Sequence, residues 1–489
     1  MKSSSDPADL ERYLGDESRL PGGSADEVFW PDSPAEAAEA LAIAASRGAP
    51  ATFSGAGTGI TGGRVPAGGV VVATDRLLRL EPRVAADGAG GTLLVGAGVA
   101  LAAAQKAAAD EGMWYPPDPT ENGAFVGGTI ATNASGARTF RFGPTRRWVR
   151  RIVVALADGS LLDLARGQVA ARDGRFEIER PGRPRLVVPA PDWPLPCTTK
   201  HAAGYYSAPG MDLVDLFVGS EGTLGCVVEA ELELIKAPAS IISGILFFEG
   251  EREALAFVAA ARGDRRSGER GVTPTALEFF DVAALALLRG AGADVPDGAR
   301  AAIFFEQPVR RDDDADALVE AWATLAEERG ADEASWLSQE PAEQQKFREF
   351  RHLVPVTINE TIARRGVRKV STDTAVPPGR AGEMLAAFRA LLDGAGLESV
   401  AFGHIGDDHV HVNILPRDPS EQAAAKALYG KLVRAAVALG GTVSAEHGLG
   451  KVKAGDLSLL YPPETVARMR AVKTALDPLG LLGRGTLFG

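Results

Sequence analysis

The chain has 489 residues, of which 45% are hydrophobic and 24% charged, and this is enough apolar material for two or three domains. Its formal net charge of −12 argues against a nucleic-acid partner, because binding to a phosphate backbone depends on basic surfaces. Two cysteines, Cys197 and Cys226, exclude an iron–sulfur cluster or a cysteine-built zinc site from this chain alone, and we expect free thiols.

The N-terminal segment reads MKSSSDPADLERYL and lacks the apolar core of a signal peptide. Nothing in the chain approaches the roughly 20 apolar residues that span a bilayer. We therefore expect a cytoplasmic protein, with peripheral contact to the inner membrane left open. The first two dozen residues are polar and marked by Gly and Pro, which favours a loosely held arm.

The first regular element predicted is a helix after Ser33, with Ser33 as N-cap, Pro34 at the first helical position and Gly48 as the stop. Strand-like residues 51–53 and 70–72 follow it, so the opening reads as β-α-β. Residues 92–95 predict a further strand, and residues 99–110 predict a second helix that ends at Gly112.

Between the strands at 51–53 and 70–72 lies a glycine-rich loop, Ser54 to Gly63, with the sequence SGAGTGITGG. It contains G-x-G-x-x-G, but a dinucleotide-binding Rossmann fingerprint must open a helix. The residues after Gly63 read RVPAGG and lead into a strand. We therefore reject an NAD site, while the loop amides remain suited to a pyrophosphate.

A second glycine-rich stretch, Pro116 to Gly136, reads PPDPTENGAFVGGTIATNASG. Glycine is unfavourable inside regular elements by roughly 0.5–1 kcal/mol relative to alanine, so this composition indicates a backbone that approaches a large flat ligand. Its amides and short hydroxyls can bond phosphate oxygens. Among the arginines that follow, we expect Arg138 to lie near this ligand.

Residues 148–157 predict a strand, and Asp158-Gly159 predicts a hairpin turn into residues 161–164. Residues 166–197 are rich in Arg, Pro and Asp, which favours an irregular insertion. Residues 219–225 predict a turn that feeds a strand over residues 226–234. The turn lacks the G-x-S-x-G pattern of a serine hydrolase.

Beyond Pro238 the pattern changes, and strands alternate with helices. Strands are expected at residues 241–248, 276–280 and 301–306, and helices at residues 252–262 and 282–289. Residues 311–314 are charged and introduce a helix with Leu318, Trp322 and Leu325 on one stripe. This order favours an α+β cap built on an antiparallel sheet.

Three of the six histidines lie in the segment GHIGDDHVHVN, residues 403–413. Its ends are strand-like and Gly406-Asp407-Asp408 is turn chemistry, so the segment predicts a hairpin. His409 and His411 alternate onto one face of its second strand. Spacing alone therefore nominates these two imidazoles as a chelating pair.

Six segments occur together in the order found in one family: SGAGTGITGG, PPDP, VGGTIATNASGARTFRFG, DLFVGSEGTLG, GHIGDDHVHVN and SAEHGLGKVK. In this the chain resembles the FAD-linked 2-hydroxyacid dehydrogenases, which include cytochrome-linked D-lactate dehydrogenase, the glycolate oxidase FAD subunit and D-2-hydroxyglutarate dehydrogenase. The resemblance covers residues 28 to 487. It implies an α+β fold, with a two-part PCMH-type FAD-binding domain at residues 1–237, a substrate cap at 238–440 and a returning segment at 441–489.

The resemblance also implies which residues bind FAD. They are Ser54, Gly55, Ala56, Gly57, Thr58, Gly59, Gly62, Pro117, Asp118, Gly127, Gly128, Thr129, Thr132, Asn133, Ser135, Gly136, Arg138, Glu221, Gly225 and Val227. Relatives that attach flavin covalently use a histidine near the first phosphate loop. This chain has none there, so FAD is expected to be non-covalent.

For a divalent metal, Zn²⁺ or Mn²⁺, the family pattern nominates His404, His411 and Glu446, and two imidazoles with a carboxylate suit such ions. Relatives carry Gly-Asn where this chain has Asp408-His409, so the place of His409 stays open. His447 is the expected base for the substrate hydroxyl, since a neutral imidazole suits that proton transfer. Arg351 and Lys369 are the expected partners of the substrate carboxylate.

The expected function is therefore oxidation of a small 2-hydroxyacid by FAD, with electrons passed to a quinone, a cytochrome or an electron-transfer flavoprotein rather than to NAD. Two alternatives stay open: a flavin oxidase of the same fold acting on a sugar or aldonolactone, and a metal-dependent hydrolase or binding protein without a working flavin. The oligomeric state is open between a monomer and a homodimer.

Overall fold

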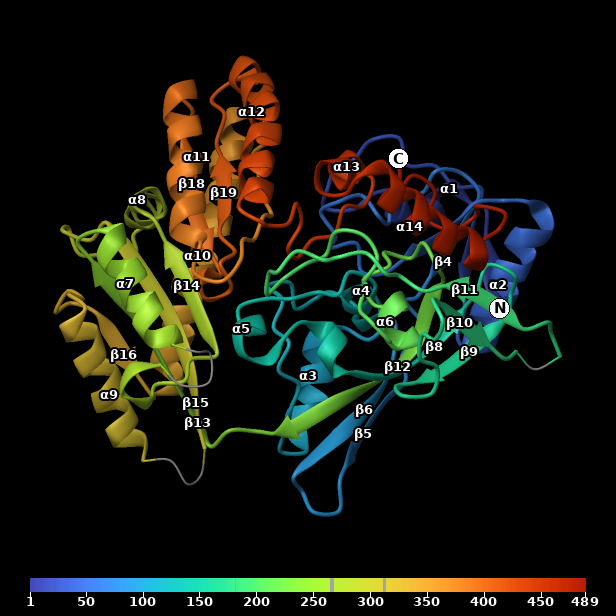
Figure 1. The fold of residues 1–489 in the computed structure, drawn as a ribbon, viewed down its shortest axis with the longest axis horizontal. Coiled ribbons are helices and arrows are strands. Elements are labelled where there is room, and N and C mark those ends of the chain that lie inside the picture. Colours follow the sequence, from blue (N-terminus) through green and yellow to red (C-terminus); the bar gives the residue numbers. More distant parts are fainter. Residues whose placement is uncertain (181, 264–267, 311–313) are drawn as a thin grey trace.

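The computed structural model describes residues 1–180, 182–263, 268–310 and 314–489. Two lobes are visible in Figure 1, joined where the chain leaves the long strand β12 (Cys226–Lys236) and enters β13 (Ser240–Phe248). No helix within these ranges combines the length and the hydropathy needed to cross a membrane.

A small mixed sheet opens the first lobe, in the order β1 (Lys2–Ser4), β2 (Glu27–Trp30), β4 (Val70–Ala73), β3 (Ala51–Ser54). Strands β2 and β3 both run parallel to β4. Helix α2 (Pro34–Arg47) connects β2 to β3, and the Ser33 hydroxyl accepts a hydrogen bond from the Glu36 amide while Gly48 closes the helix at φ 60°. The predicted caps and the β-α-β opening are confirmed.

The N-terminal segment is more ordered than expected. Strand β1 pairs with β2, and α1 (Pro7–Leu10) and the 3₁₀ turn η1 (Glu11–Tyr13) pack against the same sheet. Tyr13 is 1% exposed, and its hydroxyl accepts a hydrogen bond from the Trp30 indole. The expectation of a loosely held arm was wrong. Leu10 and Tyr13 are apolar side chains in this polar segment, and they fix it on the sheet.

A larger antiparallel sheet forms the rest of this lobe, with strand order β5 (Leu80–Val84), β6 (Gly90–Gly96), β12, β8 (Val149–Ala155), β9 (Leu161–Ala165), and with β7 (Met113–Trp114) also paired to β12. The hairpin between β8 and β9 turns at Asp158-Gly159, as the sequence predicts. The helical elements of this part of the chain are α3 (Leu101–Asp110), α4 (Val126–Ala131), α5 (Thr139–Phe142), η2 (Thr145–Trp148) and α6 (Leu213–Phe217).

The segment between residues 166 and 197 contains an antiparallel pair, β10 (Arg175–Ile178) and β11 (Leu186–Pro189). Phe176, Ile178 and Val188 are buried in the core of the first lobe. The prediction of an irregular insertion was wrong here. In β10 the apolar residues alternate with Arg and Glu, and the charged composition of the segment hides this period of two.

The second lobe is built on one antiparallel sheet, in the order β16 (Trp336–Ser338), β13, β15 (Ala301–Val309), β14 (Ala276–Phe280), β18 (Ser399–Gly403), β19 (His411–Ile414), β17 (Val370–Ser371). Its helical elements are α7 (Glu251–Arg262), η3 (Glu269–Gly271), α8 (Val282–Gly290), α9 (Ala315–Glu328), α10 (Pro341–Arg365), α11 (Ala381–Ala395), η4 (Ile405–Asp407) and α12 (Pro419–Ala438). The predicted antiparallel cap is confirmed. Of the charged run at 311–314, residues 311–313 lie outside the described residues, and Asp314 caps α9.

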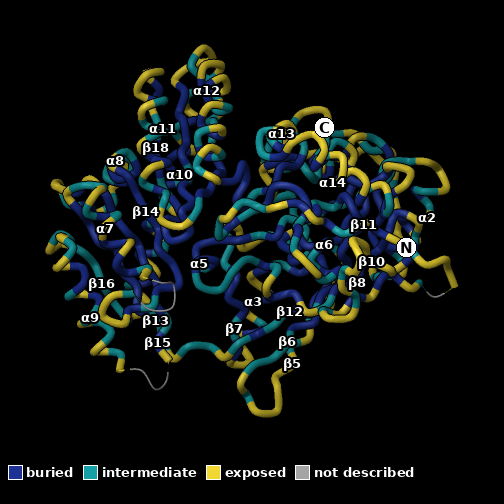
Figure 2. Tube along the Cα trace, in the orientation of Figure 1, coloured by how far each residue is buried: buried dark blue, intermediate teal, exposed yellow. Residues whose placement is uncertain are grey.

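The C-terminal segment crosses back to the first lobe through η5 (Ala454–Asp456), α13 (Leu457–Leu460) and α14 (Pro463–Leu476) (Figure 1). The Ala51 amide donates to the Leu481 carbonyl and the Gly483 amide donates to the Ala51 carbonyl. In Figure 2 buried trace lies in the interior of both lobes, whereas the outer turns of α11 and α12 and the tip between β5 and β6 are exposed. Both lobes therefore carry their own core.

Candidate active site

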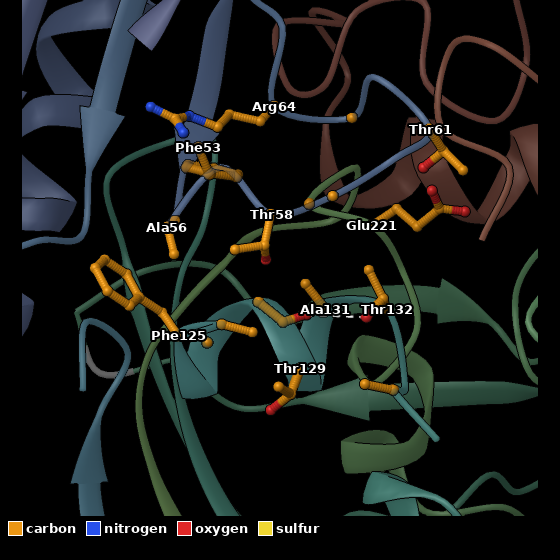
Figure 3. Close-up of a pocket in the computed structure, with 18 of the residues that line it drawn as sticks. Phe53, Ala56, Thr58, Thr61, Arg64, Phe125, Thr129, Ala131, Thr132 and Glu221 are labelled. Atoms are coloured by element: carbon orange, nitrogen blue, oxygen red, sulfur yellow. Dashed lines mark hydrogen bonds between the residues drawn. The ribbon is translucent and has the colours of Figure 1, made fainter. Parts of the chain in front are cut away.

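A cavity of about 360 Å³ lies in the first lobe and is lined by segments far apart in the sequence. They are the loop after β3, the start of α4, the turn before β12, Gly483 of the C-terminal tail, and the pair Glu446 and His447. Figure 3 shows Ala56, Thr58 and Thr61 along one side of the pocket and Phe125, Thr129, Ala131 and Thr132 along the other. The two glycine-rich stretches thus face each other across one space.

Most of the residues expected to bind FAD line this cavity: Gly55, Ala56, Gly57, Thr58, Gly59, Gly127, Gly128, Thr129, Thr132, Ser135, Glu221, Gly225 and Val227. The others are not among the residues that line it: Ser54, Gly62, Pro117, Asp118, Asn133, Gly136 and Arg138. Arg138 instead pairs with Glu306 of the second lobe, with 3.0 Å between Nε and Oε2, and lies 3.7 Å from Asp118.

The glycines of this region differ in what they permit. A Cβ on Gly127 would lie 2.6 Å from the Ala97 Cβ, and one on Gly136 would lie 1.9 Å from the Asp118 carbonyl oxygen, so these two allow close packing of the chain. A Cβ on Gly128 would meet no heavy atom within 4 Å, and Gly128 lines the cavity. The open face of α4 is therefore backbone and short hydroxyls, which fits a pyrophosphate-bearing ligand such as FAD.

Glu221 joins the cavity to the later motif. Its two carboxylate oxygens accept hydrogen bonds from the amides of Leu449 and Gly450, at 3.0 Å and 2.7 Å. Burial raises the pKa of Glu221 to about 7, although these amides oppose the shift. The contact fixes the segment that carries Glu446 and His447 against the cavity wall.

The histidine hairpin converges on one carboxylate oxygen, Oε2 of Glu446. The nearest ring nitrogens are Nε2 of His404 at 3.3 Å, Nε2 of His411 at 3.7 Å and Nδ1 of His409 at 4.0 Å. The other carboxylate oxygen, Oε1, accepts hydrogen bonds from the Ser135 hydroxyl at 2.9 Å and the Lys200 ammonium at 2.6 Å. The three residues nominated by the family pattern, His404, His411 and Glu446, therefore lie in one cluster with His409, which spacing alone had nominated.

Two observations show that this cluster fits a divalent cation. Buried carboxylates outnumber the buried ammonium of Lys200, since Glu278, Asp373, Asp407 and Glu446 all lie within or against it. The ring nitrogens that face away from Glu446 have oxygen neighbours, with Glu278 2.6 Å from His404 and the Thr372 carbonyl 3.2 Å from His411. Such contacts leave the opposite nitrogen available as a ligand.

The charges of the cluster are strongly coupled. Burial alone would raise the pKa of Glu446, but the charges of His404 and Lys200 hold it well below its usual range. His404 lies between Glu446 and Glu278, and their charges overcome burial and raise the pKa of His404 to about 9. Burial lowers the pKa of His409 to about 3. Because a ligating imidazole must be neutral, a metal bound here would displace a proton from His404.

His447 lies at the cavity end of the same cluster, with its ring stacked on His411 at 5.4 Å between centroids. Its Nδ1 lies 3.3 Å from Oδ1 of Asp373, while Oδ2 of Asp373 accepts hydrogen bonds from the Ser444 hydroxyl and the His447 amide. Burial opposes the charge on Asp373, but His447 and His409 hold its pKa well below the usual range. The Asp373 carboxylate therefore orients the His447 imidazole through Nδ1, so Nε2 is the ring nitrogen available for proton transfer.

Sequence reasoning missed Lys200, Glu278 and Asp373. Glu278 sits in the apolar strand ALEFF and is 3% exposed, and a charged residue inside such a strand is itself a signal of a buried partner. Asp373 follows β17 in a run of serine and threonine residues, which gives no such signal. Lys200 gave no signal beyond a lone cation before a Gly-Tyr segment, and only the structure shows its contacts with Gly136 and Glu446.

The two cations expected to clamp the substrate lie on the second lobe. Arg351 is on α10, 5.9 Å from the Phe304 ring, and its charge helps to lower the pKa of Glu278. Lys369 precedes β17, and burial lowers its pKa from the ordinary value of 10.5. No hydrogen bond or ion pair ties the Lys369 side chain to its described surroundings. Cys197 and Cys226 are free thiols, as expected.

Two family profiles match the chain. The FAD binding domain matches residues 25–165, and the C-terminal domain of FAD linked oxidases matches residues 238–487.

Among similar proteins, D-2-hydroxyglutarate dehydrogenase of Xanthomonas citri pv. viticola is 31% identical, over 100% of this chain and 94% of that protein. D-lactate dehydrogenase of Archaeoglobus fulgidus is 28% identical, over 94% of this chain and 90% of that protein. Glycolate oxidase subunit GlcD of Bacillus subtilis is 26% identical, over 95% and 89%. A solved structure of alkyldihydroxyacetonephosphate synthase shares the fold, with a TM-score of 0.67 at 13% identity over 98% of this chain and 81% of that one.

Proposed function

The chain belongs to the FAD-linked 2-hydroxyacid dehydrogenase and oxidase family, and on that premise we propose that it oxidises a small 2-hydroxyacid of the D-lactate, glycolate or D-2-hydroxyglutarate class to the 2-oxoacid. The family makes it an FAD-dependent hydroxyacid oxidoreductase. One observation carries the finer proposal: Glu446 and His447 line the same cavity as the two glycine-rich stretches. Electrons would pass to an acceptor other than NAD, such as a quinone, a cytochrome or an electron-transfer flavoprotein.

FAD would be held by the loop after β3, by α4 and by the turn before β12, as a non-covalent ligand. When bound, the flavin supplies an acceptor for the hydride that leaves the α-carbon of the substrate. The residues 1–237 and 441–489 would form the flavin lobe, and residues 238–440 the substrate cap.

The protein's own groups would handle the substrate oxygen atoms and the proton. His447 would take the hydroxyl proton at Nε2, because Asp373 holds its Nδ1 side and fixes the tautomer. Arg351 and Lys369 would attract the substrate carboxylate from the cap side. A divalent ion, Zn²⁺ or Mn²⁺, held by His404, His411 and Glu446 would act as a Lewis acid on the substrate oxygens.

The proposal is tested by turnover of the purified yellow protein with an artificial acceptor against a panel of D- and L-2-hydroxyacids, sugars and aldonolactones. We expect activity with one enantiomer of a small 2-hydroxyacid, no reduction of NAD, and loss of activity after chelation that Mn²⁺ or Zn²⁺ restores. Activity on sugars that survives chelation would instead support the sugar or aldonolactone oxidase. The hydrolase alternative is disfavoured by the family matches.

A further inference from the structure

His409 occupies a position that the proposed trio of His404, His411 and Glu446 does not use. Its imidazole is 0% exposed and its ring centre lies 4.4 Å from that of His411 and 5.4 Å from that of His404. One donor atom from each of the four residues lies within 4.8 Å of the others. The geometry of the cluster is therefore that of four candidate ligands.

The ring orientation of His409 matches that of its neighbours. Its Nδ1 faces Oε2 of Glu446 at 4.0 Å, while its Nε2 lies 3.3 Å from Oδ1 of Asp373. His404 and His411 show the same arrangement, with Glu446 on one ring nitrogen and a different oxygen neighbour on the other. A carboxylate behind a ligating imidazole is the usual support of a metal ligand.

Within the described residues neither ring nitrogen of His409 completes a hydrogen bond. Buried polar side chains are nearly always satisfied, so a fully buried imidazole without a hydrogen bond indicates an absent ligand or ion. His404 and His411 each have a hydrogen-bond partner on their outer nitrogen. His409 is thus the imidazole whose burial is least explained by the protein alone.

The backbone conformation of Asp408, the residue before His409, is fixed by several contacts. Asp408 lies in the left-handed region at φ 53°, which is unfavourable for a residue other than glycine. Its carboxylate accepts hydrogen bonds from the amides of Gly379 and Ala381 and pairs with Arg262. These contacts fix the turn and point the next residue, His409, into the cluster.

We propose that His409 is a fourth protein ligand, through Nδ1, so that three imidazoles and the Glu446 carboxylate hold a divalent first-row metal. This rests on the metal site in the proposed function. Four protein ligands would fill a tetrahedral Zn²⁺ ion, whereas Mn²⁺ or Fe²⁺ accepts further ligands and keeps positions for substrate oxygen atoms. With His409 as a fourth ligand, Mn²⁺ or Fe²⁺ would keep an open position for the substrate, and Zn²⁺ would do so only by exceeding four-coordination.

The test uses the full FAD-loaded chain, stripped of metal with a chelator and titrated with Mn²⁺. His409→Asn is expected to weaken Mn²⁺ binding by at least about tenfold, the smallest loss typical of a supporting residue. His411→Asn, in the proposed trio, should do the same, and His352→Asn, on the exposed face of α10, should leave the affinity unchanged. Flavin absorbance checks that each variant is folded.

A second measurement needs no variant. Pulsed electron paramagnetic resonance of Mn²⁺ bound to the wild type counts the coordinated imidazoles, and we expect three. Two imidazoles, or wild-type Mn²⁺ affinity in His409→Asn while His411→Asn loses it, would overturn the fourth ligand and leave the proposed metal site intact. Absence of metal binding by the wild type would overturn both.

Discussion

At the scale of single residues, Asp373 is the group through which the site is organised. It is 0% exposed, and its carboxylate contacts Ser444, His447 and His409. Its partners are spread over two motifs separated in sequence, so it can fix the ring of the proposed base and the hairpin histidine together. In the proposed reaction Asp373 would act as a positioning residue, through its contact with His447.

Asp373→Asn is expected to lower the rate of flavin reduction by roughly 10²- to 10⁴-fold, the usual contribution of an oriented acid–base group. The amide would place N–H groups where the His447 amide and the Ser444 hydroxyl now donate. The measurement is anaerobic stopped-flow reduction at saturating substrate, with flavin content as the folding check. Ser444→Ala is the milder control, and a wild-type rate in Asp373→Asn would remove the positioning role.

Lys369 gives a pH prediction. Burial lowers its pKa below 10.5, so it loses its charge at a lower pH than an ordinary lysine does. If it attracts the substrate carboxylate, KM should increase with pH on the alkaline side while kcat changes little. Lys369→Met should have a higher KM at neutral pH and lack this alkaline increase, and an identical pH profile in the two proteins would contradict the role.

At the scale of elements, the adjacent residues Gly127 and Gly128 of α4 are glycines for different reasons. Both Gly127 and Gly128 line the cavity, but a Cβ on Gly127 would meet Ala97, whereas a Cβ on Gly128 would meet open space. Both give the same signal in a sequence, because composition reports only that a side chain is missing. Which of them has room for a side chain follows from the packing of α4 on β6 and the loop after it.

Gly128→Leu should therefore give a colourless protein with nearly unchanged apoprotein stability, within about 1 kcal/mol. Gly127→Leu should instead destabilise the apoprotein by about 1–3 kcal/mol through overpacking. Flavin absorbance after purification and urea unfolding of the two apoproteins separate the effects. A fully yellow Gly128→Leu protein would show that this face of α4 does not contact the cofactor.

The elements that the sequence predicted well are those whose signals are local. Both ends of α2 are marked within one segment, by Ser33 and Pro34 at its start and Gly48 at its end. The two residues Asp158-Gly159 mark the hairpin between β8 and β9. The pair β10 and β11 was missed because the buried side of each strand depends on distant core residues. Tyr13 was missed for the same reason, since its burial depends on Trp30 and on the sheet behind it.

The site residues also divide into those with a local sequence signal and those whose role depends on distant contacts. The glycine-rich stretches, the histidine hairpin and the Glu446-His447 pair are each visible as short motifs, and resemblance to a family supplied the roles proposed for them. Lys200 could not be found in this way, because its significance lies in a contact with Glu446, far away in the sequence. Glu278 stands out as a charge in an apolar strand, but its partner His404 is equally distant and could not be identified. No local pattern encodes such pairs.

At the scale of the whole molecule, the two lobes meet at the site. Lys200 of the first lobe lies 3.4 Å from Asp407 of the second, and Arg138 of the first lobe pairs with Glu306 in β15 of the second. The Arg138 side chain is 13% exposed and that of Glu306 is 3% exposed. Breaking a buried pair by removing one partner is more costly than replacing both.

Arg138→Met is accordingly expected to destabilise the protein by about 3–5 kcal/mol, because it leaves the Glu306 carboxylate buried without its partner. The double variant Arg138→Met with Glu306→Leu should recover much of that loss. Equilibrium unfolding in urea, followed separately by flavin release and by circular dichroism, measures both. Equal stability of wild type and single variant would show that this pair does not hold the lobes together.

The central claim is that the glycine-rich cradle and the imidazole cluster act on one substrate across one cavity. Single-turnover reduction of the flavin by a 2-hydroxyacid, without oxygen, tests it most directly in the wild type and in His447→Asn. We expect the variant to stay yellow and its reduction to slow by about 10²- to 10⁴-fold. Reduction of His447→Asn at the wild-type rate would contradict the account.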